Sequence, residues 1–355
     1  MRLLLVTNDF PPKPGGIQTY LKNLLDAFDD ETLIVAPHDA RAPGDEVGVV
    51  RGRRVYMLPG SETRSLVREA AVSLAADAVL FGAPHPLPRM GPWLRRELGI
   101  PYGILSHGAE LAIPGSVPGA RQLLGRTLAA ADARFAVSRF TARHVSSLSG
   151  KPTEIIGAGV EVDTFTPPDK APVNDVPVVG CVSRFVPRKG QGRLLEAVAR
   201  LDQEVEVLFV GTGRTEQKLR RLADKLGVNA RFEVDVPWSE LPGLYRSMDM
   251  FCMPCKSRWG GLEFEGFGLV FLEAAASCLP VLAGDSGGSP ETVLPGETGF
   301  VVSSVDDIVE GLSILLDDPT RAVEMGQKGR RLMESEFTWE RVVERLCSGF
   351  DPYIR

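Results

Sequence analysis

Short apolar runs alternate with amphipathic segments along the first half of the chain. In the runs the apolar residues stand at successive positions, which is typical of strands buried on both faces of a parallel sheet. The intervening segments repeat their apolar positions with helical spacing. The pattern therefore predicts a doubly wound α/β unit; its strands are expected at 2–7, 32–37, 78–82, 101–107 and 133–138, and its helices at 17–28, 88–98 and 139–148.

The segment Pro167–Pro177 (PPDKAPVNDVP) is rich in proline and charge and lacks periodicity, so it is predicted to be a linker. After it the alternation restarts, with strands expected at 176–184, 205–211, 230–236 and near 250–255 and 281–284, and helices at 191–201, 214–227 and around 270–278. The sequence thus predicts two Rossmann-like domains, 1–168 and 169–335, that face each other across a cleft. Residues 336–355 carry an amphipathic pattern and are expected to form a terminal helix that packs back on the first domain; its apolar positions are Trp339, Val342, Val343 and Leu346.

Length, charge and cysteine content narrow the class of protein. At 355 residues the chain exceeds the roughly 250–300 residues of one hydrophobic core, which agrees with two domains. A net charge of -6 argues against a general nucleic-acid binder. The N-terminal apolar run is too short for a membrane span or a signal peptide, which predicts a cytoplasmic protein. Cys252 and Cys255 form a lone CxxC among five cysteines, and we interpret them as buried residues at a strand end.

Two glycine-containing loops are candidates for phosphate contacts. Gly15 and Gly16 stand between the first strand and the first helix, where bare N–H groups can approach an anion. Two glycines before a helix are more often a tight strand-to-helix turn, which is the alternative interpretation. Gly211 and Gly213 stand at the corresponding place in the second domain. Neither G-x-G-x-x-G nor the P-loop pattern occurs at the first loop, which disfavours dehydrogenases and kinases.

Two cations follow the first strand of the second domain. Arg184 and Lys189 occur in SRFVPRKGQG, and Arg188 is a nearby alternative. Cations in a strand-end loop suit a diphosphate, because arginine offers a planar fork and lysine a compact charge. A solvated basic loop is the alternative interpretation.

The strongest signal is the segment WGGLEFEGFGLVFLEAAASC. Glu265 lies in a glycine-flanked loop and Glu273 lies eight residues later, about two turns into a helix expected to begin near Gly268. Unpaired charge is costly in so apolar a stretch, so the carboxylates are predicted to bind ligand hydroxyls. Gly266 and Gly268 would leave the start of the helix open to a phosphate.

EGFGLVFLE is similar to the Glu-x7-Glu signature of glycosyltransferase family 4 enzymes of the GT-B fold. The glycine loop, the His-Gly loop, the Arg and Lys pair and the two glutamates follow one another in that family's order. TNDFPPKPGGIQTYL and SRWGGLEFEGFG resemble in particular the GDP-mannose-dependent phosphatidylinositol mannosyltransferases. The resemblance covers essentially the whole chain. It implies an acceptor-binding first domain, a nucleotide-sugar-binding second domain and transfer of mannose to a phosphatidylinositol mannoside at the inner membrane surface.

The resemblance also implies roles for residues. Arg184 and Lys189 would hold the donor diphosphate, Glu265 would contact the donor hexose and Glu273 the ribose; the other donor contacts would be Gly16, Gly211, Gly266, Phe267 and Gly268. His107 would lie near the reacting centre, although a lone histidine at a strand end is more often structural. Asp9, Gly15 and Gln18 would contact the acceptor, and Ser138 and Arg139 are expected to be structural or to line the pocket.

Family members retain the anomeric configuration, and charge builds on the leaving diphosphate as the sugar bond opens. Fixed cations and helix ends can stabilise that charge, so no metal or other cofactor is expected. No Asp-x-Asp motif occurs. The residue or substrate atom that takes the acceptor proton stays open.

The segment PRMGPWLRRELG combines Met90, Trp93 and Leu94 with three arginines, Arg89, Arg95 and Arg96. Such a combination suits a patch at an anionic membrane surface, which Arg121 and Arg126 could extend. An amphipathic helix packed on the sheet would show the same pattern.

Three other functions remain open. The first is a family 4 transferase that uses UDP-glucose or UDP-N-acetylglucosamine with a soluble or other lipid-linked acceptor. The second is a non-catalytic nucleotide-sugar-binding protein, which the presence of Glu265, Arg184 and Lys189 disfavours. The third is a phosphorylase or a nucleotide-sugar epimerase with two Rossmann halves; no motif supports the pyridoxal-phosphate lysine that a phosphorylase requires.

Overall fold

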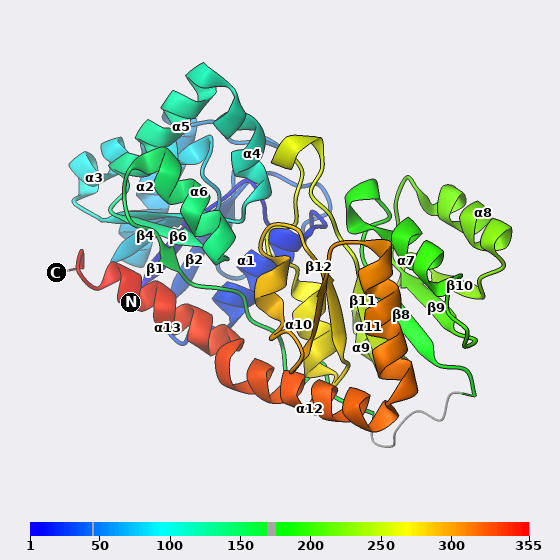
Figure 1. Ribbon diagram of the computed structural model, residues 1–355. Coiled ribbons are helices and arrows are strands. Elements are labelled where there is room, and N and C mark those ends of the chain that lie inside the picture. The colour runs from blue at the N-terminus through cyan, green and yellow to red at the C-terminus, as the bar shows by residue number, and fades with distance from the viewer. Residues whose placement is uncertain (45, 169–174, 355) are drawn as a thin grey trace. The chain divides into compact units, whose positions relative to one another are not determined.

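The computed structural model describes residues 1–44, 46–168 and 175–354, and the chain divides into two compact units (Figure 1). Unit 1 comprises Met1–Gly159 and Trp339–Arg355, and unit 2 comprises Val160–Thr338. The predicted boundaries were 168/169 and 335/336. Residues just after Gly159 belong to unit 2 because the Val160 N–H donates to the Phe337 carbonyl (2.9 Å) and the Phe165 ring packs edge-on against Tyr245. Residues 169–174 of the predicted linker lie outside the described part.

Unit 1 contains a parallel sheet in the order β3-β2-β1-β4-β5-β6-β7. Its strands are β1 (Leu3–Val6), β2 (Thr32–Ala36), β3 (Val49–Arg51), β4 (Ala78–Phe81), β5 (Tyr102–Ser106), β6 (Ala133–Ala136) and β7 (Glu154–Ile155). Leu3 of β1 pairs with Thr32 on one side and with Ala78 on the other. The strand order therefore reverses between β1 and β4, and ligands of doubly wound sheets bind at the carboxyl ends of the strands at such a point.

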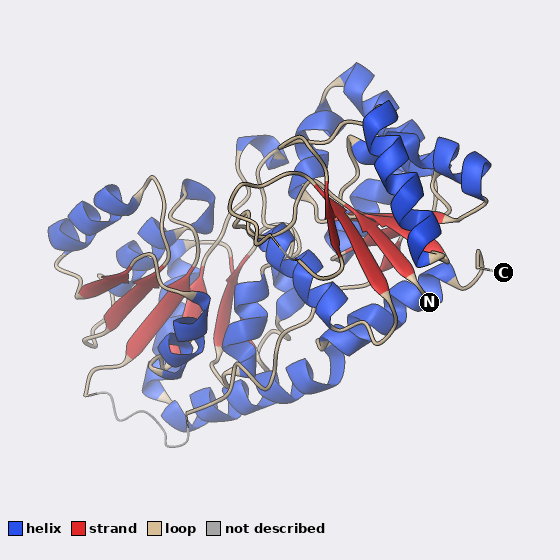
Figure 2. Cartoon of the chain, turned by 180° about the vertical axis from the view of Figure 1, so that it is seen from behind, coloured by secondary structure: helices blue, strands red, loops and turns tan. Residues whose placement is uncertain are grey.

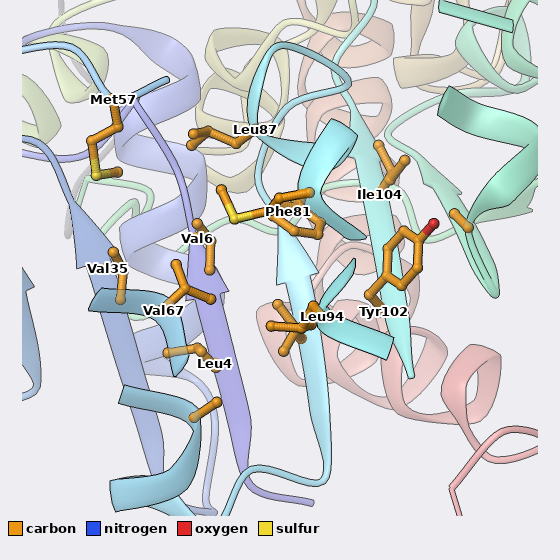
Figure 3. Close-up of a cluster of buried hydrophobic side chains, with 14 of the residues drawn as sticks. Leu4, Val6, Val35, Met57, Val67, Phe81, Leu87, Leu94, Tyr102 and Ile104 are labelled. Carbon is orange, nitrogen blue, oxygen red and sulfur yellow. The ribbon is translucent and has the colours of Figure 1, made fainter. Parts of the chain in front are cut away.

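Helices cover both faces of this sheet (Figure 2). They are α1 (Gly16–Asp26), α2 (Ser61–Leu74), α3 (Gly91–Leu98), α4 (Ala109–Ser116), α5 (Pro118–Ala130), α6 (Arg139–Ser149) and α13 (Trp339–Phe350). Every residue of β1 is fully buried because successive side chains enter opposite layers. Figure 3 shows one layer, in which Leu4, Val6 and Phe81 of the sheet face Val67 of α2 and Leu94 of α3.

The other layer contains the C-terminal helix. The Phe350 ring of α13 lies 5.1 Å from the Phe135 ring of β6. Gly103 of β5 makes room for both rings, since a Cβ there would lie 2.7 Å from each. Helix α13 thus completes the core of unit 1, although it is separated from the rest of the unit by all of unit 2 in the sequence.

Unit 2 repeats the same winding in a parallel sheet of order β10-β9-β8-β11-β12-β13. Its strands are β8 (Val178–Val182), β9 (Glu206–Val210), β10 (Ala230–Glu233), β11 (Met250–Met253), β12 (Val281–Gly284) and β13 (Gly299–Val302). Its helices are α7 (Gln191–Val198), α8 (Glu216–Leu226), α9 (Leu241–Arg246), α10 (Leu269–Ala276), α11 (Val305–Asp317) and α12 (Pro319–Glu336). The order reverses between β8 and β11, which makes the loops after these two strands the expected ligand site.

The prediction that the apolar residues of segment 88–99 contact a membrane is wrong. Met90 and Leu94 are fully buried in the core of unit 1. Trp93 is partly buried, and the guanidinium carbon of Arg64 lies over its ring, 5.4 Å from the ring centre. The apolar stripe of α3 packs on the sheet, as an ordinary amphipathic helix does. Its arginines, Arg89, Arg95 and Arg96, are exposed.

Across the described ranges, no helix combines the length and the apolar character that crossing a membrane requires.

Candidate active site

A buried ion cluster lies at the carboxyl end of the unit 2 sheet. A single 3₁₀ turn (Pro187–Lys189) follows β8 and turns both Arg188 and Lys189 toward Glu265, 76 to 77 residues later in the chain. Lys189 Nζ lies 2.7 Å from Glu265 Oε2, and Arg188 Nη1 donates to the same oxygen. Both Lys189 and Glu265 are less than one-tenth exposed. The predicted lysine and carboxylate are thus brought together.

The two cations determine the ionisation of Glu265. Burial alone would raise the pKa of this carboxyl, but the charges and hydrogen bonds of Lys189 and Arg188 outweigh burial and lower its pKa to about 2. Glu265 is therefore an anion throughout the neutral range. Its backbone is also fixed, because its N–H donates to Ser286 Oγ (3.1 Å) and its carbonyl accepts from the Gly288 N–H (3.0 Å).

Glycines allow the strand-end loops to pack closely around this cluster. Gly190 has φ 80°, and a Cβ there would lie 2.0 Å from the carbonyl oxygen of Pro254, which follows β11. Gly211 (φ 135°) and Gly213 (φ 154°) press in the same way against the carbonyls of Ser183 and Phe185. The G-x-G pattern is therefore explained by the approach of two backbones, whether or not a nucleotide contacts it.

Glu273 lies in the second turn of α10, which begins at Leu269 after Gly268. Its Oε2 accepts a hydrogen bond from the buried Tyr245 hydroxyl (2.7 Å). Burial raises the pKa of Glu273 to about 7, against the opposing effect of the Tyr245 hydrogen bond. The tyrosine donates to one carboxylate oxygen and leaves Oε1 for a ligand, as a hydroxyl-binding role would require.

Two predicted donor residues, Arg184 and Phe267, lie in different surroundings. Arg184 is exposed and lies outside the buried cluster, whose arginine is the alternative, Arg188. Phe267 is buried, with its ring 6.1 Å from that of Phe337, so only its backbone is free to face a ligand. Gly266 is partly buried in the same loop.

In unit 1, His107 follows β5 and is buried. Its Nε2 lies 3.1 Å from the Gly82 carbonyl, which follows the neighbouring β4, so Nε2 carries the proton and Nδ1 is the free acceptor of the neutral ring. Burial lowers the pKa of His107, with a smaller opposing effect from Glu110. The ring also packs edge-on against Tyr20 (5.1 Å between ring centres). His107 is therefore a fixed, neutral imidazole near the point where the strand order reverses.

The predicted acceptor residues meet after β1. Asp9 Oδ1 accepts from Gln18 Nε2 (2.8 Å) and from Lys13 Nζ (2.7 Å). Gly15 has φ 154° and ends the loop before α1, whereas a side chain at Gly16 would meet open space. Open space at the first residue of a helix leaves its N–H groups accessible to an anion.

Three residues of these clusters were missed or given little weight at the level of sequence. Arg188 was only an alternative, and Tyr245 and Glu110 were not considered. Glu110 Oε1 accepts the backbone N–H groups of His107 (2.5 Å) and Gly108 (3.1 Å), which fixes the His-Gly loop. A glutamate three residues after the histidine at a helix start is a capping pattern that could have been recognised. Ser138 caps α6 by accepting from the Thr141 N–H (3.0 Å), a structural role.

No group of three or more histidine, cysteine, aspartate or glutamate side chains suited to a metal ion occurs within residues 1–44, 46–168 and 175–354. Cys252 and Cys255 are both buried, and Cys255 Sγ lies 3.3 Å from Ser289 Oγ.

Comparison with known proteins gives the same class of protein as the site residues. Residues 14–164 match the family model "Glycosyltransferase Family 4", and residues 163–332 match "Glycosyl transferases group 1". The chain belongs to this family of glycosyltransferases, and its two parallel-sheet units have the GT-B fold.

Its curated relatives share most of their length with it. A GDP-mannose-dependent monoacylated alpha-(1-6)-phosphatidylinositol monomannoside mannosyltransferase of Corynebacterium glutamicum is 38% identical, with 98% of this chain and 97% of the relative covered. A GDP-mannose-dependent alpha-(1-6)-phosphatidylinositol monomannoside mannosyltransferase of Mycolicibacterium smegmatis is also 38% identical, with 97% of each covered. Among solved structures, Anabaena HepE in complex with UDP superposes with a TM-score of 0.82 at 18% identity, covering 99% of this chain and all of that one.

Proposed function

We propose that this protein transfers mannose from GDP-mannose to a phosphatidylinositol mannoside, with retention of the anomeric configuration. The observation that carries the proposal is the buried cluster of Lys189, Arg188 and Glu265 at the strand-order reversal of unit 2, in a chain 38% identical over its length to enzymes of that name. A cluster with two cations and one carboxylate matches a donor that presents a diphosphate beside a hexose.

In this proposal the protein supplies positioning and charge. Negative charge grows on the leaving diphosphate as the bond to the sugar opens, and Lys189, Arg188 and the exposed Arg184 are the cations available to stabilise it. Glu265 orients the hexose hydroxyls, and Glu273 binds the ribose through the oxygen that Tyr245 leaves free. We further propose that transfer needs no metal ion, so a chelator leaves the rate unchanged.

Because the proposed acceptor is a membrane lipid, the protein needs a surface that can contact the bilayer. In unit 1, Ile113 on α4, Val117 between α4 and α5, and Leu123 on α5 are 67%, 51% and 46% exposed. Arg121 and Arg126 are exposed on α5. Glu110 is the only acidic residue between 109 and 131, and its Oε1 turns inward to the His107 loop. Apolar and cationic side chains on one helix pair suit an anionic bilayer surface.

Donor choice is tested by thermal stabilisation and slow hydrolysis with GDP-mannose, UDP-glucose and UDP-N-acetylglucosamine. We expect a response to GDP-mannose that is lost in Lys189→Met. A response to a UDP-sugar alone would exclude GDP-mannose as the donor, and no response to any of them would exclude the enzyme interpretation.

Lipid contact is tested by sedimentation with vesicles of phosphatidylcholine, with and without phosphatidylinositol. We expect binding only with phosphatidylinositol, and loss of binding in an Arg121→Glu, Arg126→Glu double variant. A matched pair of charge reversals at Arg220 and Arg221, on α8 of unit 2, should leave binding unchanged. Equal binding of both double variants would contradict the assignment of α4 and α5.

A further inference from the structure

A surface loop in unit 2 carries an exposed tryptophan that has no role in the proposed mechanism. Residues 256–264 connect β11 to Glu265. The Trp259 residue at the tip is 66% exposed, which is unusual for so large an apolar group.

The loop is attached at its base to the donor cluster. The Lys256 N–H donates to the Arg188 carbonyl (2.8 Å), and Ser257 Oγ lies 3.2 Å from Ser286 Oγ. Ser286 Oγ also accepts the Glu265 N–H. Both ends of the loop are therefore tied to residues that hold the candidate hexose site.

The tip is closed by a second set of bonds. Arg258 and Glu263 pair through their backbones, with the Arg258 N–H donating to the Glu263 carbonyl (2.8 Å), and through a side-chain ion pair (2.9 Å). Four residues, Trp259 to Leu262, project beyond this closure. The loop is fixed although it is exposed.

The conformation of Trp259 is strained. Its φ is 51°, in the left-handed region that bulky residues rarely occupy, and the two following glycines, Gly260 and Gly261, have φ of 64° and 90°. Such strain persists only where the surrounding structure enforces it, and it is concentrated at binding sites. The arginine of the closure also lies over the indole, with the Arg258 guanidinium carbon 4.7 Å from the ring centre. One face of the ring is thus covered by a cation, and the exposure of the residue leaves the opposite face open.

We propose that Trp259 is a platform on which a sugar or inositol ring of the acceptor stacks. The C–H groups on one face of such a ring carry slight positive charge and match the negative face of an indole. The acceptor must come within bonding distance of the donor hexose, which the proposed function puts at Glu265, and the loop that carries Trp259 is tied to that residue. The proposal rests on the proposed function, and it adds a subsite that selects the acceptor.

The test compares the steady-state kinetics of Trp259→Ala and Trp259→Phe with those of wild type and of Trp238→Ala. Trp238 is the matched control, because it is another tryptophan of unit 2 with half of its surface exposed (52%). Each protein is assayed with phosphatidylinositol monomannoside in micelles and with its water-soluble deacylated form, and hydrolysis of GDP-mannose without acceptor is measured separately.

We expect Trp259→Ala to raise KM for both acceptor forms about tenfold, and Trp259→Phe to raise it less. KM for GDP-mannose and the rate of hydrolysis should stay within about twofold of wild type, as should every parameter of Trp238→Ala. Unchanged acceptor KM in Trp259→Ala would overturn the platform. A defect confined to the micellar acceptor would overturn it as well, by assigning Trp259 to lipid contact. A wild type that transfers no mannose would overturn the proposed function itself.

Discussion

Replacement of Glu265 by glutamine tests whether the buried cluster is as strongly coupled as its geometry indicates. The folded protein holds the pKa of this carboxyl at about 2, compared with 4.5 for a free glutamate. This difference corresponds to about 3 kcal/mol of folding free energy at 1.36 kcal/mol per pH unit. Glu265→Gln removes the charge and leaves Lys189 and Arg188 buried beside a neutral amide. We therefore expect the free energy of unfolding to fall by about 3 kcal/mol at pH 7.

The sign of the pH dependence follows from the lowered pKa. The charge of Glu265 stabilises the fold fully above pH 4.5, and its contribution is lost as the pH falls toward 2. The difference between wild type and Glu265→Gln should therefore be constant from pH 8 to about pH 5 and shrink below that. For a unit of the size of unit 2, about 3 kcal/mol corresponds to a melting temperature lower by about 6–12 °C.

The assay is calorimetric or fluorescence-detected melting between pH 3 and 8, with Glu263→Gln as the control. Glu263 forms a partly exposed ion pair with Arg258, so its replacement should cost no more than about 1 kcal/mol. A Glu265→Gln protein that melts with the wild type at pH 7 would refute the coupling. A deficit that does not change between pH 5 and pH 3 would refute its electrostatic origin.

Two further predictions concern the same unit. The pKa of Glu273 is raised to about 7, so the folded protein holds an extra proton and loses stability as the pH rises from 4.5 through 7. The melting temperature of Glu273→Gln relative to wild type should therefore be higher at pH 8 than at pH 5. A difference in melting temperature that is the same at both pH values would contradict this. Gly190→Ala should destabilise the protein by more than about 3 kcal/mol, because its Cβ would lie 2.0 Å from the Pro254 carbonyl, whereas Gly227→Ala, at a similar φ with open space around it, should cost about 1 kcal/mol. Equal chemical-denaturation midpoints of these two variants would be inconsistent with that contact.

The alternating pattern predicted the central strands of both sheets well, but of the edge strands it predicted β10 and missed the others. β1 and β8 are runs of buried residues, which the pattern indicates directly. β3, β7 and β13 were not predicted, and each lies at the edge of its sheet. Edge strands are short and are covered on fewer sides; both residues of β7 are exposed. Their apolar pattern is correspondingly weak.

The candidate site was predicted to the level of its loops and not of its pairings. The motifs placed Lys189 in the loop after the first strand of unit 2 and Glu265 in a glycine-flanked loop, where the structure has them, but they did not show which of Arg184 and Arg188 pairs with Glu265. That choice depends on the 3₁₀ turn after β8, which carries Arg188 inward and leaves Arg184 exposed. Tyr245 carries no local signal, since its hydroxyl contacts Glu273, which lies 28 positions later in the chain.

The most direct test of the account is the product made by the purified protein from GDP-mannose and phosphatidylinositol monomannoside, analysed by mass spectrometry of the lipid. The account predicts a lipid heavier by one hexose, absent when Lys189 is replaced by methionine and unaffected by a chelator. A lipid that gains no hexose from GDP-mannose, or gains one only from a UDP-sugar, would contradict it.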